Sequence, residues 1–150
     1  MYTTAVTPVV AETRTNALAL VETIDPAAVA VSTADCDLTY RELDAWSNRL
    51  ARVLLELGAR PGARIAVAVE PAIEAAVTRW AIAKTGATPV DGDAVPFGID
   101  LGVTTKARRG KLSDSVGWLV LDDRSTLVRY MTGSDAPITD ADRMPARQAS

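Results

Sequence analysis

The sequence predicts an α/β fold, in which a layered and mostly parallel sheet is flanked by helices. Apolar residues recur at three- and four-residue spacing over residues 43–57 and again over residues 73–81, which is typical of amphipathic helices. Residues 64–69 between them are almost continuously apolar, as in a strand that is buried on both faces of a parallel sheet. Helices that alternate with such strands favour a layered sheet with right-handed crossovers.

The chain begins with segments of weak periodicity. Residues 1–12 are predicted to form an extended arm or linker, and residues 13–23 carry a weak helical pattern. Residues 28–32 and 38–40 are then predicted to form two short strands, antiparallel to each other and joined by a turn.

The spacing predicts a helix over residues 39–57. Thr39 and Glu42 have the form of a capping box, in which each side chain satisfies a free backbone N–H at the start of the helix. Gly58 is placed to end this helix in a left-handed conformation, and Pro61 prevents its continuation.

A second helix is predicted over residues 71–84, with Pro71 as its first helical residue and Gly86 after its end. Trp46 and Trp80 lie on the apolar stripes of the two helices. We therefore expect both indoles to pack in the core rather than to form a stacking platform for a ligand.

The second half of the chain has shorter elements. Three more strands are predicted, over residues 87–90, 101–104 and 118–121, and residues 91–100 are predicted to be a loop. The chain as a whole is predicted to have three parts: an arm or linker over residues 1–12, an α/β core over residues 13–123, and a loop-rich tail over residues 124–150.

The chain contains one cysteine and no histidine. Without histidine there can be no Ser-His-Asp or Cys-His catalysis, and a zinc site would lack ligands. Cys36 lies between Asp35 and Asp37, whose negative charges disfavour a thiolate, so we interpret it as an inert residue of a strand or turn. The sequence singles out no catalytic, cofactor-binding or metal-ligating residue.

The charge balance argues against two classes of partner. The chain has 16 Lys and Arg against 19 Asp and Glu, a net charge of -3, so neither a nucleic acid nor an anionic membrane is expected to bind it. Four cations do cluster in a short segment, at Lys106, Arg108, Arg109 and Lys111. No aromatic residue interleaves with them, so a solvated loop or short helix is the preferred interpretation.

The location predicted from the sequence is the cytoplasm. There is no run of 18 apolar residues, which a membrane-spanning helix would need. Residues 1–12 lack the cationic start and apolar segment of a secretory signal, and a single cysteine suits a reducing compartment.

Several segments together resemble a known family. Residues 38–52 (LTYRELDAWSNRLAR) resemble the first core motif of the adenylation domains of nonribosomal peptide synthetases, in the adenylate-forming superfamily. Residues 80–87 (WAIAKTGA) are similar to the second motif of that family, and three later segments follow in the same order, at residues 102–105, 118–123 and 137–143. The resemblance implies that the chain is part of the N-terminal subdomain of such a domain.

The resemblance also implies where the chemistry of the family lies. A complete domain of this family uses ATP and Mg²⁺, which need a Ser/Thr/Gly-rich phosphate loop, an acidic residue and a late lysine. Residues 130–134 (YMTGS) partly match the start of that loop but lack its second glycine and its lysine, and they precede residues 137–143 instead of following them. We therefore expect this chain to bind no cofactor by itself.

Residues 91–100 depart from the family pattern. The family has a helix here, but only four residues separate Pro96 from Leu101, and a parallel crossover normally takes about a dozen residues. Either residues 101–104 pair differently in this chain, or this layer of the fold is remodelled.

Two functions remain open from the sequence. The chain is an N-terminal fragment of an amino-acid-activating adenylation domain, inactive by itself, or it is a natural truncated or degenerate domain that acts as a scaffold or interaction module. An exposed sheet face or edge predicts a partner, either a second copy or the missing remainder of the domain. We expect a homodimer interface near Val67, Val90 or Val120, unless residues 123–150 fold back and cover that face within one chain.

Overall fold

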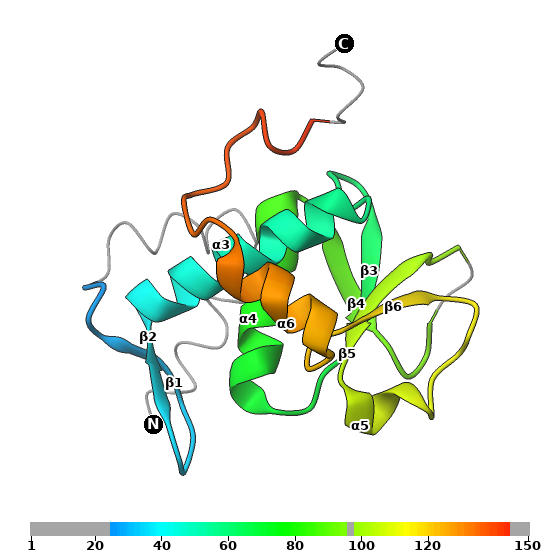
Figure 1. The fold of residues 1–150 in the computed structure, drawn as a ribbon, viewed down its shortest axis with the longest axis horizontal. Helices are drawn as coiled ribbons and strands as arrows, with labels where there is room; N and C mark the ends of the chain where they lie inside the picture. The colour runs from blue at the N-terminus through cyan, green and yellow to red at the C-terminus, as the bar shows by residue number, and fades with distance from the viewer. Residues whose placement is uncertain (1–24, 96–97, 145–150) are drawn as a thin grey trace.

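The computed structural model describes residues 25–95 and 98–144, so the predictions for residues 1–23 lie outside the described residues (Figure 1). The described strands form a two-stranded sheet of order β1-β2 and a four-stranded sheet of order β4-β3-β5-β6. The strands are β1 (Val29–Ser32), β2 (Asp37–Thr39), β3 (Arg64–Ala68), β4 (Thr88–Asp91), β5 (Leu101–Thr104) and β6 (Gly117–Val120). The helices are α3 (Tyr40–Glu56), α4 (Ala72–Thr85), α5 (Lys106–Arg109) and α6 (Arg124–Thr132). All pairings in the larger sheet are parallel, which confirms the predicted α/β class.

The start of α3 follows the local signals in the sequence. β1 and β2 pair antiparallel, as predicted, and β2 leads directly into the helix. The Glu42 N–H donates to the Thr39 hydroxyl at 3.1 Å, and the Thr39 N–H donates to the Glu42 carboxylate at 2.9 Å, so the capping box is confirmed. Gly58 has a φ of 110°, the left-handed conformation expected after the helix. Pro71 is the N-cap of α4 and not its first helical residue, so the helix begins one residue later than predicted, at Ala72.

The hydrophobic core lies between the parallel sheet and two helices. α3 and α4 pack against each other over one face of the sheet, and α6 lies against α3 (Figure 1). The core-facing residues of the sheet include Ile65, Val67 and Val103, each at most 5% exposed. They belong to one buried cluster with Leu50 and Leu54 of α3. Successive residues of a strand point to opposite faces, so the residues between them face away from the helices.

The shortened segment after β4 remodels one layer of the fold. Residues 92–100 carry the chain from β4 across to β5, which pairs with the other side of β3. β5 is parallel to β3, with Gly102 opposite Ala66, so the pairing direction is the usual one for a parallel sheet. No described residue of this connection is helical. Of the two alternatives left by the sequence, the remodelled layer is therefore the one that the structure shows.

An aromatic ring covers the part of β5 around Gly102, on the face of the sheet that this connection crosses. The strand register places Val90, Ala66, Gly102 and Trp118 side by side in one row. A Cβ atom on Gly102 would lie 2.4 Å from the Trp118 ring, so the indole rests directly on the glycine. The indole N–H also donates to the Ser113 carbonyl at 2.7 Å. At the place where the resemblance implies a helix, the small residues Ala66 and Gly102 and the Trp118 ring form the surface of this face of the sheet.

The prediction of a loop-rich tail is wrong for residues 124–132, which form α6. The apolar pattern of this segment is weak, and tertiary contacts stabilise it instead. Thr126 is buried, and the Tyr130 ring lies 5.1 Å from the Trp46 ring. The described residues after Gly133 contain turns but no helix or strand, as predicted for the rest of the tail.

We expect Gly102→Ala to lower the free energy of unfolding by about 1–3 kcal/mol, because the new methyl group would overlap the Trp118 ring. Gly110→Ala is the matched control, since a Cβ there meets nothing within 4 Å and its φ of -68° suits any residue. Denaturant unfolding measures both. In the Trp118→Ala background the cost of Gly102→Ala should largely vanish, and an unchanged cost would contradict the proposed contact.

Candidate functional site

A buried lysine joins the two helices of the core. Lys84 of α4 is 3% exposed, and its ammonium donates to the Asp44 carboxylate at 2.5 Å, the Asp44 carbonyl at 3.1 Å and the Asn48 side-chain oxygen at 2.7 Å. Burial lowers the pKa of Lys84, and the hydrogen bond and charge of Asp44 oppose that shift. All three donors of the ammonium therefore have partners on α3.

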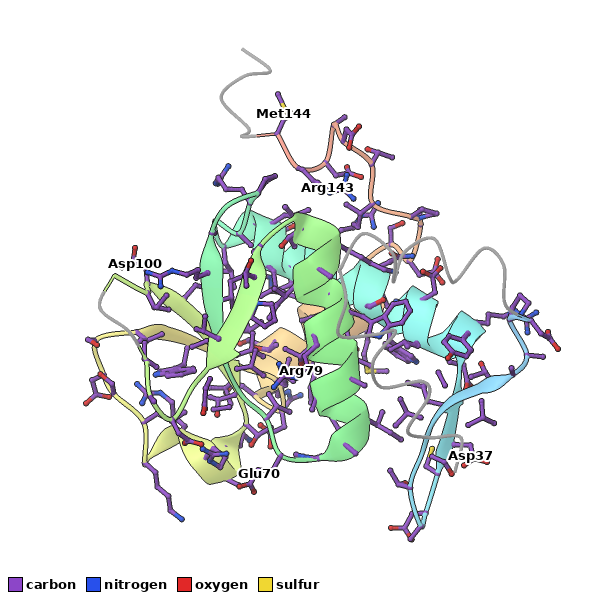
Figure 2. All side chains as sticks on the ribbon, turned by 180° about the vertical axis from the view of Figure 1, so that it is seen from behind. Asp37, Glu70, Arg79, Asp100, Arg143 and Met144 are labelled. Atoms are coloured by element: carbon purple, nitrogen blue, oxygen red, sulfur yellow. The ribbon has the colours of Figure 1, made fainter. Side chains whose placement is uncertain are left out.

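The same region of α3 holds the segment that follows α6. Asn48 donates to the Asp135 carbonyl at 2.9 Å, Arg49 donates to the Gly133 carbonyl at 2.9 Å, and Arg52 donates to the Ala136 carbonyl at 2.6 Å. Further along, Arg143 donates to the Lys84 carbonyl at 2.7 Å, above the helices in Figure 2. The lysine of the second motif and its neighbours are thus structural, because they fasten α3, α4 and the tail to one another.

The two tryptophans singled out by the sequence are less buried than expected. Trp46 and Trp80 are both half-buried and pack against the core from its edge. Trp46 contacts the Tyr130 ring and carries the Arg49 guanidinium 5.2 Å from its ring centre, and Trp80 lies 6.4 Å from the Tyr40 ring. Both tryptophans pack against the core as predicted, but neither is at its centre, and Trp46 also lines a cavity.

The basic segment is partly neutralised by carboxylates. Arg108 and Arg109 belong to the short helix α5, and each is ion-paired: Arg108 with Glu70 and Asp93, and Arg109 with Asp114. The interpretation as a short helix is confirmed.

Cys36 lies in the turn between β1 and β2, one of the two predicted positions, and its side chain is exposed. Its backbone N–H donates to the Thr33 hydroxyl at 3.1 Å, and the Thr33 hydroxyl donates to the Cys36 carbonyl at 3.0 Å. The residue therefore serves the geometry of the turn.

Residues 130–134 do not fit a nucleotide phosphate. Tyr130, Met131 and Thr132 form the last turn of α6, so their amide groups belong to helical hydrogen bonds. A phosphate loop needs free N–H groups that point at the anion. Here the carbonyl oxygens are engaged instead, since Arg49 donates to those of Met131 and Gly133. Residues 130–134 thus contain the end of α6 and its C-cap.

A cavity of about 650 Å³ lies at the carboxyl ends of the strands, between α3, α4 and α6. Its volume is within the usual range for small-molecule sites. Its lining is mainly apolar: Leu38, Trp46, Leu50, Pro71, Ile73, Val77, Ala107, Leu121, Leu127 and Met131. Its polar lining residues are Glu70, Glu74, Thr105, Asp122 and Tyr130. Sequence analysis missed this cavity because α6, which forms one wall, was predicted to be a loop.

The polar groups of the cavity are biased toward negative charge. Burial raises the pKa of Tyr130, and the nearby charge of Glu74 adds to that shift, so the phenol stays neutral at physiological pH.

A second cavity of about 580 Å³ lies near Ile99 and Leu112, on the remodelled side of the fold.

Within the described ranges, no three His, Cys, Asp or Glu residues are grouped so that they could hold a metal ion. No helix in that part of the chain is long and apolar enough to cross a membrane.

The matching family is that of the AMP-binding enzymes, whose model covers residues 13–94. The chain belongs to this family. It is 33% identical over 135 residues to the probable non-canonical nonribosomal peptide synthetase CymA of Salinispora arenicola, across 81% of this chain and 2% of CymA. It is 34% identical over 125 residues to the phosphinothricin tripeptide synthetase PhsC of Streptomyces viridochromogenes, across 75% of this chain and 12% of PhsC.

Solved structures give the same family. The nonribosomal peptide synthetase FmoA3 (S1046A) matches with a TM-score of 0.62 and 27% identity, over 76% of this chain and 13% of that one. That protein has also been solved with α-methyl-L-serine-AMP bound. The likeness to an adenylate-forming fold is therefore confirmed in sequence and in structure, although the chain spans only 2% and 12% of the two relatives above.

We expect Lys84→Met to lower the free energy of unfolding by about 1–3 kcal/mol, because the side-chain oxygen of Asn48 and the oxygens of Asp44 would lose a buried donor. Lys111→Met removes a lysine charge from an exposed position and should change the stability by less than about 0.5 kcal/mol. Urea unfolding of the two variants gives both values. Equal midpoints for Lys84→Met and the parent chain would show that the buried ammonium does not hold the helices together.

Proposed function

We propose that this chain supplies the N-terminal α/β part of an amino-acid-activating adenylation domain in nonribosomal peptide synthesis. The observation that carries the proposal is the continuous family match over residues 13–94, with two peptide synthetases among the relatives. The first core motif covers most of α3, and the second lies at the end of α4. Lys84 of the second motif contacts Asp44 and Asn48 of the first. The motifs thus support each other physically.

The proposed role is that of a scaffold for chemistry performed by other parts of the domain. A complete domain of the family uses ATP and Mg²⁺, and residues 130–134, which resemble the start of its phosphate loop, do not fit a phosphate. We infer that the phosphate loop and the catalytic lysine come from outside this sequence. We infer that the residues that select the amino acid to be activated also lie outside this sequence.

The chain by itself should make no aminoacyl-adenylate. Residues 130–134 present no preorganised N–H groups to a phosphate, and the chain has a net charge of -3, which disfavours ATP. Amino-acid-dependent exchange of pyrophosphate into ATP, measured over the standard amino acids, should not exceed a boiled control. Exchange above that control would contradict the proposal that the catalytic groups lie elsewhere.

A chimera tests the scaffold role directly. Residues 38–90 of this chain, placed in FmoA3 in exchange for its matching residues, should preserve exchange that depends on α-methyl-L-serine to within about tenfold. The matched control is the same chimera carrying Lys84→Met, which should lose stability and with it most of the exchange. A well-folded parent chimera without exchange would contradict the proposed equivalence and favour a non-enzymatic role.

We also propose that a partner covers the open parts of the sheet, either a second copy or the remainder of the domain. β4 and β6 are the outer strands of the described sheet, and such edges are rarely left bare. Val67 is 5% exposed and lies in the core beneath the helices, so the proposed interface is limited to the surface near Val90 and Val120. Val90 and Val120 are half-buried on the opposite face and remain available.

Light scattering coupled to size exclusion measures this association. For a homodimer we expect about twice the chain mass of 15.9 kDa at protein concentrations near 100 μM, since an interface of this kind should bind at least in the micromolar range. A mass of 15.9 kDa at every concentration up to that value would exclude the second copy as the partner.

A further inference from the structure

The large cavity lies where open α/β sheets bind ligands. From β3 the chain passes to β4 on one side, and from β5 it passes to β6 on the other. The carboxyl ends of β3 and β5 therefore form the switch point of the topology, the usual location of a ligand crevice. Glu70 and Pro71 follow β3, Thr105 follows β5, and all three residues line the cavity.

One largely buried residue of the cavity wall, Thr105, has a hydroxyl without a partner among the described residues. Thr105 is 8% exposed and occupies the N-cap of α5, yet its side chain makes no capping hydrogen bond and no other bond to the described residues. In the part of the chain that the structure describes, no fully sealed side-chain nitrogen or oxygen lacks a partner. The Thr105 hydroxyl is therefore not sealed in protein, and the open space that Thr105 lines is the cavity.

The charged side chains that line the cavity are all acidic among the described residues. They are Glu70, Glu74 and Asp122, while Arg49 and Arg108 lie next to lining residues without lining the cavity themselves. Glu70 is paired with Arg108 at 3.3 Å, and Asp122 accepts the backbone N–H of Lys106 at 2.8 Å. The Glu74 carboxylate has neither an ion pair nor a hydrogen bond among the described residues, so its charge is available to a ligand.

The remaining wall is apolar and accessible from one side. Leu127 and Met131 of α6 are 39% and 59% exposed, although both line the cavity. Trp46 and Ile73 are half-buried in the opposite wall, on α3 and α4. An occupant would thus meet apolar side chains on two sides and carboxylates at the strand ends.

We propose that this cavity binds an amphipathic organic cation, with an aromatic or branched alkyl body and a protonated primary amine. The amine would donate to the Glu74 carboxylate and the Thr105 hydroxyl, and the body would lie against Trp46 and the exposed apolar residues of α6. A free amino acid is disfavoured because its carboxylate would face three carboxylates. The site is therefore distinct from that of an activated amino acid, and it does not depend on the proposed function.

Calorimetric titration of the full chain with tryptamine, tryptophan and indole tests this. Tryptamine should bind at one site, and tryptophan and indole should each bind at least about tenfold more weakly, the first because it adds a carboxylate and the second because it lacks the amine. Tryptophan or indole binding as tightly as tryptamine, or no saturable binding of tryptamine, would overturn the proposal.

Three variants locate the binding. Glu74→Gln should weaken tryptamine binding about two- to fivefold, and Thr105→Val about threefold, while Asp35→Asn, which removes an exposed carboxylate from the β1–β2 turn, should leave it unchanged. Circular dichroism and denaturant unfolding check that each variant is folded. Equal weakening by Asp35→Asn, or no change in a folded Thr105→Val variant, would mean that tryptamine binds an acidic surface and not the cavity.

Discussion

The arrangement of this chain depends on one buried ammonium group. Lys84 is the residue through which α4 is fixed to α3, and all of its hydrogen-bond partners lie within one turn of α3. An ammonium that has lost its hydration must have each donor satisfied, so the relative position of the two helices is set to within hydrogen-bond distance.

The segment that follows α6 is bound to α3 and α4 next to Lys84. Asn48 accepts from Lys84 with its side-chain oxygen and donates to the Asp135 carbonyl with its nitrogen, so one amide links the helix pair to the chain after α6. Arg143 then returns to the Lys84 carbonyl. These contacts hold a polar segment in place without a hydrophobic core of its own. α6 is thereby kept over the strand ends, and the cavity exists because α6 lies there.

What the sequence could predict was local. The capping box at Thr39 and Glu42, the apolar stripe behind it and the run at residues 64–69 each depend on neighbours within a few positions, and each is confirmed. α6 could not be predicted in this way because Tyr130 is held by Trp46, more than 80 residues earlier. The cavity was missed for the same reason, since its lining comes from strands and helices spread from Leu38 to Met131.

The remodelled layer shows how a parallel sheet can lose a crossover helix and stay buried. A helix covers a sheet face from a distance of several ångströms, whereas an indole that lies flat on glycine covers it in direct contact. For an indole to replace a helix here, the central strands must carry only small side chains on this face, and Ala66 and Gly102 meet that condition. The ring must also be fixed in orientation, and the hydrogen bond from the Trp118 indole to the Ser113 carbonyl fixes it. The face is thinner as a result, and β3 and β5 still meet in the register of an uninterrupted parallel sheet. The strand ends that line the cavity therefore keep their positions although the connection between β4 and β5 is short.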